Sequence, residues 1–192
     1  LAASNLWDHV EDELEESVEM RRIGGLTIAE SEDDEKEIRS KKLEEEKLGI
    51  PGELLTPDTL KEFEPLIGST VRLAEYCPLD GYVNPLKITP AWLRAGIRMG
   101  VEVHPFTSIE TISESQNGWK ISSKNESWWA KNVILVPGPW TSTLMQQIGI
   151  EIEMNSVAIQ IHLTERIPPR MKYLIQHIGQ GLSVKQVDSG QI

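Results

Sequence analysis

The chain has 192 residues, 39% of them hydrophobic, and a formal net charge of −11 at pH 7. This length and composition suffice for one hydrophobic core or two small ones. The acidic balance, without a basic stripe, excludes a surface that neutralises nucleic-acid phosphates. No apolar run approaches the ~20 residues that span a bilayer, and no amino-terminal segment resembles a signal peptide, so we expect no membrane span and a cytoplasmic protein.

The cysteine and histidine content bounds the metal and redox chemistry. Cys77 is the single cysteine, which excludes an internal disulfide framework and an all-cysteine metal site. The four histidines lack the spacing of metal ligands, so we expect no metal. The chain also contains no Gly-x-Ser-x-Gly elbow, Walker loop or His-Glu-x-x-His helix, which hydrolases, nucleotide-hydrolysing enzymes and zinc proteases require. Catalytic side chains therefore cannot be assigned from motifs.

The negative charge is concentrated in the amino-terminal third. Residues 1–64 carry a net charge of −12 and residues 65–192 carry +1. Within segment 32–48, Glu35 with Arg39 and Glu37 with Lys41 are four residues apart, the spacing of ion pairs along one helix face. We interpret this acidic segment as a solvated helix face, with a basic protein partner as the alternative.

The amino-terminal half is predicted to mix helices and strands. Hydrophobic periodicity defines the elements, and cap residues, Gly and Pro mark their ends. In chain order they are a first helix carrying Leu6, Val10 and Leu14, a strand from Met20 to Ala29 with a bend at Gly24-Gly25, a charged helix near 32–48, a short helix opened by Thr56-Pro57 and closed by Pro65, a strand from Val71 to Tyr76 and a helix near 87–99.

The carboxy-terminal half is predicted to be richer in strands, with Asn117-Gly118 as the strongest hairpin signal. Its elements are a short strand from Val101 to His104, a hairpin of Ile109–Ser115 and Trp119–Ser123, a buried strand from Val133 to Val136, a helix from Trp140 to Ile148, and strands at 151–164, 171–178 and 182–187. The alternating segment 151–164 is expected to pair antiparallel with 171–178. It is expected to lie in a different sheet from the continuously apolar segment 133–136.

The junction after segment 133–136 is the first candidate for a ligand site. An apolar, β-branched run ends at Gly138, and a helical pattern follows. Ligands of open α/β sheets bind beyond the carboxyl ends of the strands, and a glycine there lets the backbone approach a ligand closely. The same pattern also occurs at junctions that only pack, so the surrounding sequence must decide between the two interpretations.

The surrounding motifs, taken in order, resemble the FAD-dependent D-amino-acid oxidase superfamily, and within it the branch of glycine oxidase, the sarcosine oxidase β-subunit and cyanide-forming glycine dehydrogenase. The resemblance extends over most of the chain. It is carried by Leu6-Trp7, Arg22-x-Gly24-Gly25-Leu26-Thr27-Ile28, Leu60-x-x-x-Glu64-Pro65, Asp80-Gly81-x-Val83-x-Pro85, Gly100-Val101-Glu102-Val103, the segment from Val133 to Trp140, and Leu182-Ser183-Val184-Lys185-Gln186.

The resemblance implies which residues contact FAD. The strand after the 87–99 helix would meet the adenine end of the cofactor through Glu102 and Val103. The turn made by Gly138, Pro139 and Trp140 would pass near the flavin or its ribityl-phosphate chain. Where the family commonly has two alanines before this glycine, the chain has Val136 and Pro137, and a proline removes a backbone donor. The alternative for Glu102 and Val103 is an ordinary buried strand.

The substrate residues follow from the chemistry that the family performs. Oxidation of an amine by flavin needs the reacting carbon held over the ring and the substrate carboxylate paired with a cation or hydroxyl, and the protein need not supply a nucleophile. Gln160, His162 and Lys185 are the residues expected to face that pocket. The alternatives are a surface or sheet histidine at 162 and a solvated lysine at 185.

The fold class expected is α+β, or mixed α/β. Residues 1–75 and 151–192 would form an antiparallel-sheet substrate domain with helices, and residues 76–150 would be an inserted part of a Rossmann-like FAD-binding domain. The chain begins at Leu1 and lacks the Gly-x-Gly-x-x-Gly turn that holds the FAD pyrophosphate in this family. We therefore interpret it as the internal part of a larger flavoprotein.

The function expected of the parent protein is FAD-dependent oxidation of the C–N bond of a small amino acid or secondary amine, of the glycine, sarcosine or D-amino-acid class. The resemblance allows a hetero-oligomer with other oxidoreductase subunits. This chain by itself is expected to retain little FAD and to be inactive. The alternative is a binding or assembly module that keeps the substrate-domain fold without flavin, and the presence of a Gly-x-Gly-x-x-Gly segment upstream would distinguish the two.

Overall fold

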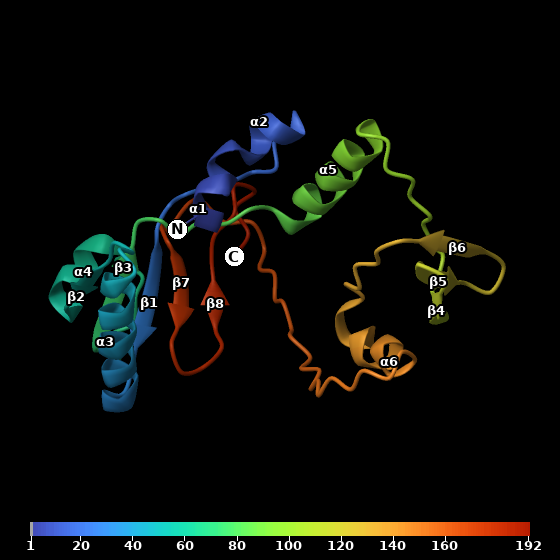
Figure 1. The fold of residues 1–192 in the computed structure, drawn as a ribbon. Helices are drawn as coiled ribbons and strands as arrows, with labels where there is room; N and C mark the ends of the chain where they lie inside the picture. Colours follow the sequence, from blue (N-terminus) through green and yellow to red (C-terminus); the bar gives the residue numbers. More distant parts are fainter. Residues whose placement is uncertain (1) are drawn as a thin grey trace. The chain divides into compact units, whose positions relative to one another are not determined.

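The computed structural model describes residues 2–192, which divide into two compact units (Figure 1). Unit 1 comprises residues 2–101 and 162–192, and unit 2 comprises residues 102–161. These boundaries differ from the predicted ones, because residues 76–101 belong with unit 1 and residues 151–161 with unit 2. The assignment of one part to substrate and another to FAD stays a prediction.

Unit 1 is built on a five-stranded sheet in the order β2-β3-β1-β7-β8. The strands are β1 (Gly25–Ala29), β2 (Glu53–Leu55), β3 (Leu73–Cys77), β7 (Leu174–His177) and β8 (Ser183–Val184). Three of its four strand pairings are antiparallel, whereas β1 and β7 run parallel. The mixed α/β class is therefore confirmed, but the sheet is mixed rather than purely antiparallel.

Strand β1 lies at the centre of this sheet, and all five of its residues are buried. Leu26 and Ile28 point to one face and enter the main core. Ala29 belongs to a second cluster with Ile38, and by the strict alternation of a strand it points to the other face. The main core consists of Leu26, Ile28, Leu55, Leu60, Val71, Ala74, Tyr173 and Ile175.

Helix α3 (Glu32–Lys47) covers the second face, in contact with β1 and β3 (Figure 1). It begins with a capping box, in which Asp34 N donates to Ser31 Oγ at 3.1 Å and Ser31 N donates to Asp34 Oδ2 at 2.9 Å. The helix predicted near 32–48 is confirmed. The predicted pairing of Glu37 with Lys41 is wrong, because the Lys41 ammonium contacts Glu45, one turn further along the helix, and Glu75 on the sheet.

The remaining helices of unit 1 are α1 (Ala2–Leu6), the 3-10 helix η1 (Trp7–His9), α2 (Val10–Leu14), α4 (Pro57–Phe63) and α5 (Pro85–Arg98). Helix α4 starts as predicted, with Thr56 as N-cap and Pro57 at its first position. Helices α2 and α5 share a small core of Val10, Leu14, Val18, Ile88 and Ala91. The rings of Trp7 and Trp92 extend this contact, with centroids 5.6 Å apart.

Unit 2 contains a three-stranded antiparallel sheet of β4 (Thr111–Ser115), β5 (Gly118–Ser122) and β6 (Ser127–Ala130). The predicted hairpin around Asn117-Gly118 is confirmed, and Asn117 has the positive φ of 62° that such a turn requires. Sequence analysis did not predict β6. The short helices η2 (Gly138–Trp140) and α6 (Thr141–Gln146) follow.

Two short predicted strands in unit 2 are wrong. Residues 101–104 and 133–136 have extended or irregular backbone and belong to none of the strands found in residues 2–192. Ile134 and Val136 are 85% and 83% exposed, which is the opposite of the burial expected from a continuous apolar run. A run of β-branched residues favours extended backbone, but a strand also needs a hydrogen-bonding neighbour, and neither segment has one here.

The long strand predicted for Glu151–Thr164 is also wrong. The segment has no regular secondary structure, and nearly all of its side chains are exposed. Its expected partner, the segment around β7, instead pairs with β1 and β8. Alternation of polar and apolar residues identifies two faces, but it does not identify a partner strand, and that partner decides whether a strand forms.

We predict that Ile38→Ala will lower the free energy of unfolding by about 2–5 kcal/mol, because it opens a cavity where α3 meets the sheet. Ile38 is fully buried between Ala29 and Leu73. The matched control is Leu43→Ala on the same helix, which is 58% exposed and should change stability by less than about 0.5 kcal/mol. Urea denaturation of both variants tests this, and equal effects would contradict the packing of α3.

Candidate functional site

The turn at Gly138 adopts a conformation that favours glycine. Gly138 has a φ of +60°, and a Cβ built on it would meet nothing within 4 Å. The hydroxyl of Thr141 donates to the Gly138 carbonyl at 2.7 Å and thereby fixes the turn at the start of α6. Pro139 and Trp140 are exposed beside it, Trp140 by 68%. The turn thus presents backbone and an aromatic ring to open space.

A pocket of about 630 Å³ in unit 2 borders this turn. Residues 133–137 and Trp140 form one wall, and the rest comes from segment 107–110, β4, β5, α6 and Gln147. Gln147 ties these elements together, since its side chain accepts from Ile112 N at 3.0 Å and donates to the Glu110 carbonyl at 2.9 Å. The pocket is mostly apolar and is large enough for a planar ring system.

The other two residues predicted to contact FAD lie in the irregular segment at the start of unit 2. Glu102 and Val103 are exposed, so the alternative of a buried strand is wrong for them. The nearby His104 contacts Trp128 of β6, with ring centroids 5.0 Å apart. The structure does not bring Glu102 or Val103 into the lining of the pocket next to Gly138. Their contact with FAD stays a prediction.

The three predicted substrate residues are distributed over both units. Gln160 is an exposed residue of unit 2, whereas His162 and Lys185 belong to unit 1. The ammonium of Lys185 lies 4.5 Å from the centroid of the Tyr82 ring, a cation–π contact. Partial burial lowers the pKa of Lys185 below its ordinary value. Lys185 is therefore a desolvated lysine rather than a freely solvated one.

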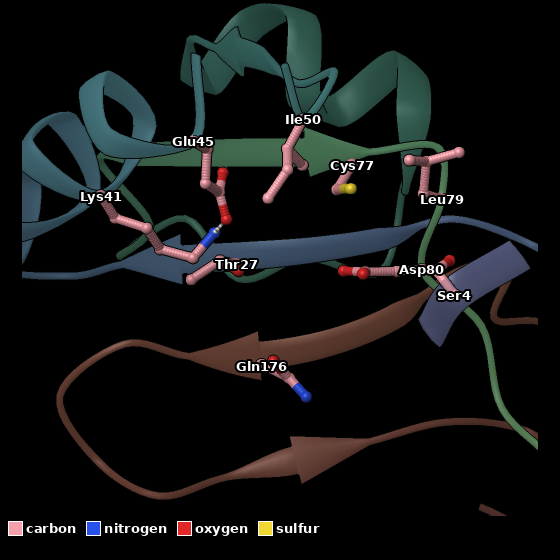
Figure 2. A pocket seen from close by; sticks show the side chains of 9 residues that line it. All are labelled: Ser4, Thr27, Lys41, Glu45, Ile50, Cys77, Leu79, Asp80 and Gln176. Carbon is pink, nitrogen blue, oxygen red and sulfur yellow. Dashed lines mark ion pairs between the residues drawn. The ribbon is translucent and has the colours of Figure 1, made fainter. Parts of the chain in front are cut away.

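A second pocket, of about 290 Å³, lies in unit 1 between α3 and the sheet (Figure 2). Sequence analysis missed it, because its lining comes from segments far apart in the chain. The polar lining consists of Ser4, Thr27, Lys41, Glu45, Asp80 and Gln176, and Ile50, Cys77 and Leu79 complete it. Asp80 also lines an adjoining pocket of about 330 Å³ with Trp7, Arg22 and Tyr82.

A buried charge cluster forms the wall of the smaller pocket. The Lys41 ammonium contacts Glu45 Oε1 at 2.6 Å and Glu75 Oε2 at 2.8 Å. The Glu75 side chain is only 1% exposed, and the second oxygens of Glu45 and Glu75 have no hydrogen-bond donor among the described residues. Two carboxylates that share one lysine in a buried site favour the retention of one proton between them.

The pKa values of the two carboxyls move in opposite directions. Burial raises the pKa of Glu75, and the neighbouring Glu45 raises it further, although Lys41 opposes both effects. Burial also acts to raise the pKa of Glu45, but hydrogen bonds with Glu75 and Lys41 outweigh it and the pKa is lowered. These opposite directions favour protonation of Glu75 over protonation of Glu45.

Among residues 2–192, no three His, Cys, Asp or Glu side chains converge in a way that could hold a metal ion. Across the same part of the chain, no helix combines the length and the apolarity needed to cross a lipid bilayer.

The mixed sheet of unit 1 and the antiparallel sheet of unit 2 together define an α/β protein whose fold is shared with flavin-dependent enzymes. L-proline dehydrogenase from P. horikoshii superposes with a TM-score of 0.83 over 99% of this chain and 52% of that chain, at 19% identity. A family model described as FAD dependent oxidoreductase matches residues 1–187. The chain therefore belongs to this family, as the motifs predicted.

Relatives with known names are distant in sequence. Glycine oxidase from Bacillus licheniformis is 24% identical over 99 residues, which cover 52% of this chain and 27% of that relative. Sarcosine oxidase subunit beta from Arthrobacter sp is 24% identical over 197 residues, which cover 97% of this chain and 48% of that relative. The chain spans about half or less of the length of these proteins, so the activity of the whole protein is a matter of proposal.

We predict a pH-dependent stability difference for Glu75→Gln. Because folding raises the pKa of Glu75, the folded chain holds this proton more tightly than the unfolded chain. The ordinary pKa of a glutamate is 4.5. As the pH rises from this value through the pKa of Glu75 in the folded chain, the contribution of Glu75 to the free energy of unfolding is therefore lost. Glutamine stays neutral, so the stability of the variant relative to the unmodified chain should increase with pH.

Urea unfolding of both chains from about pH 4.5 to about pH 8 measures this difference. The exposed Glu53→Gln on β2 is the matched control and should show no such trend. A stability difference between Glu75→Gln and the unmodified chain that is constant with pH would contradict a raised pKa at Glu75.

Proposed function

We propose that the protein of which this chain is part oxidises the C–N bond of a small amino acid or secondary amine, with FAD as the electron acceptor. Membership of the FAD dependent oxidoreductase family, which covers residues 1–187, is the observation that carries this proposal. Similarity to a glycine oxidase and to a sarcosine oxidase subunit supports the amine class of substrate. The particular amine is left open between glycine, sarcosine and D-amino acids.

The geometry at Gly138 fits a flavin cofactor. The positive φ and the open space where a Cβ would stand allow a flat ligand to approach the backbone closely. The exposed Trp140 ring and the apolar pocket beside it provide surface that a ring system can cover. Pro137 and Pro139 have no N–H groups, so backbone hydrogen bonds to the ligand at this turn must come from Gly138 or from residues after Pro139.

When bound, the flavin would accept a hydride from the substrate carbon that carries the amine. The residues of this chain would bind and orient the two molecules. Gly138, Pro139 and Trp140 would contact the cofactor, as would Glu102 and Val103 at its adenine end. The substrate carboxylate needs a cation, and the desolvated Lys185 is suited to this role because its charge is less screened by water.

Gln160 and His162 complete the proposed substrate contacts. Both are exposed and lie in irregular backbone, so their side chains are free to orient toward a ligand. A neutral His162 would serve as an acceptor for the amine proton, and Gln160 as a donor to the carboxylate. We further propose that the protein acts in the cytoplasm and that it assembles with other oxidoreductase subunits, which the likeness to a sarcosine oxidase subunit supports.

A non-catalytic module that keeps this fold without flavin is the competing function. Unit 2 has exposed apolar side chains, including Ile134 and Val136. These side chains favour the binding module because they offer a surface on which another protein could pack. The two functions differ in one measurable property, which is stoichiometric binding of FAD by the intact protein. An intact protein that purifies without FAD and does not take it up would establish the module instead.

We predict that the 192-residue chain by itself binds FAD more weakly than micromolar and oxidises no amine. Its sequence contains no Gly-x-Gly-x-x-Gly turn, which provides the backbone N–H groups and helix terminus for the pyrophosphate. Titration of FAD, followed by the quenching of flavin fluorescence, measures the dissociation constant. A value of about 1 μM or lower would show that the residues present here suffice to hold the cofactor.

We predict that Gly138→Val in the intact flavoprotein lowers FAD occupancy at least about tenfold, because a branched side chain would occupy the space that the flavin requires. Gly149→Val is the matched control. Gly149 also has a positive φ, of 76°, and open space at the Cβ position, so both variants carry the same kind of backbone strain.

The flavin absorbance of each purified variant, together with its melting temperature, separates a loss of cofactor from a loss of stability. Full FAD loading of Gly138→Val, or an equal loss in both variants, would contradict the assignment of Gly138 to the flavin site.

A further inference from the structure

The pocket between α3 and the sheet of unit 1 contains a carboxyl group, that of Asp80, which no basic side chain contacts directly. Burial raises the pKa of this carboxyl, while the more distant charges of Lys41 and Arg22 act to lower it. Asp80 lines the pocket from the loop after β3, and its carboxylate projects into the space between α3 and β7 (Figure 2). Among residues 2–192, Asp80 forms no ion pair. The nearby cations are already paired, Lys41 with Glu45 and Glu75, and Arg22 with Asp8.

The backbone is shaped to admit this carboxylate. A Cβ at Gly25 would lie 2.6 Å from Asp80 Oδ2, so only a residue without a side chain leaves room for Asp80 over the central strand. Two hydrogen bonds also hold the backbone of the loop that carries Asp80. Gly24 N donates to the Asp80 carbonyl at 2.9 Å, and the Arg22 guanidinium donates to the Leu79 carbonyl. The carboxylate is therefore held in the pocket rather than free to turn into solvent.

A second polar group points into the same pocket from β1. The Thr27 side chain is two residues beyond Gly25 and on the same face of the strand, and Thr27 is only 9% exposed. No other described residue forms a hydrogen bond with its hydroxyl, which lines the pocket. The hydroxyl is therefore available to accept a hydrogen bond from a ligand or water in that space.

The size and donor set of the pocket restrict its ligand. A volume of about 290 Å³ is at the small end of ligand pockets, which suits a molecule of a few non-hydrogen atoms. Protein sites for divalent metal ions usually combine several His, Cys, Asp or Glu side chains, and no group of three or more such side chains occurs among residues 2–192 in an arrangement that could hold a metal. An organic ammonium needs only one carboxylate and one or two neutral acceptors, which Asp80 and Thr27 supply.

We propose that this pocket binds the ammonium group of a small organic amine, with the Asp80 carboxylate as its counter-ion and the Thr27 hydroxyl as a second acceptor. The Lys41–Glu45–Glu75 cluster forms a rigid polar wall, and the Cys77 and Leu79 side chains close the apolar side. The site lies wholly within unit 1. It requires no flavin and no oxidation, so it does not rest on the proposed function.

The probe for the experiment is methylammonium chloride, added to the 192-residue chain labelled with ¹⁵N and observed by amide NMR. Sodium chloride at the same ionic strength is the control for non-specific charge effects. We expect saturable shifts at the amides of Gly25, Thr27 and Asp80. Sodium acetate should produce no shifts. Glycine and sarcosine carry a carboxylate as well as an amine. They should bind if the pocket also accepts a carboxylate near Lys41, and should fail to bind if it accepts simple amines alone.

Two variants test the residues. Asp80→Asn keeps the shape and removes the charge, and it should raise the dissociation constant for methylammonium at least about tenfold. Asp33→Asn removes the same charge from a side chain that is 91% exposed on α3, and it should leave binding unchanged. Thr27→Val replaces the hydroxyl by a methyl group and should weaken binding about threefold.

The outcomes are distinct from those of the flavin experiments. Absence of saturable shifts in the unmodified chain, or equal weakening by Asp80→Asn and Asp33→Asn, would overturn the proposal. If Asp80→Asn does not give a folded spectrum, the Thr27→Val comparison decides, and unchanged affinity in that variant would also overturn it. An amine that binds here while FAD fails to bind the intact protein would keep this proposal and remove the proposed oxidase.

Discussion

The burial of strand β1 on both of its faces is the constraint on which unit 1 depends. Its backbone is hydrogen-bonded to β3 on one side and to β7 on the other, and none of its five residues is exposed. One face contributes Leu26 and Ile28 to the main core. The other must accommodate both α3 and the loop that carries Asp80, and the absence of a side chain at Gly25 makes this geometrically feasible.

The charges under α3 follow from this packing. Glu75 lies on the central part of β3 where an apolar residue would pack at lower cost, and a buried carboxylate is tolerated only with a partner. Lys41 provides that partner and also pairs with Glu45. Because the ammonium of a lysine on α3 contacts a carboxylate on β3, this network helps to fix the helix on the sheet, beside the apolar contacts of Ile38.

Elements with local signals were predicted correctly, whereas elements that depend on distant partners were not. Thr56-Pro57 marks the start of α4, and Asn117-Gly118 marks the hairpin, because each dipeptide itself favours the required backbone conformation. Segments 133–136 and 151–164 have strand-like composition but no neighbouring strand. The unit 1 pocket was missed for the same reason. Its lining residues Lys41, Asp80 and Gln176 are far apart in the sequence. The order of the strands in the sheet brings them to the same pocket, and hydrophobic periodicity does not encode that order.

The two units differ in the kind of surface that they offer to a ligand. Around Gly138 the pocket walls are mostly apolar, with polar side chains such as Ser108, Thr143 and Gln147 at places in the lining, which suits a broad planar ring with few charges. In unit 1 the pocket is small and charged, and its unpaired group is a carboxylate. The two pockets therefore suit different ligands, a planar ring in unit 2 and a compact cation in unit 1. Because each pocket lies within one unit, binding at one can be measured without reference to the other.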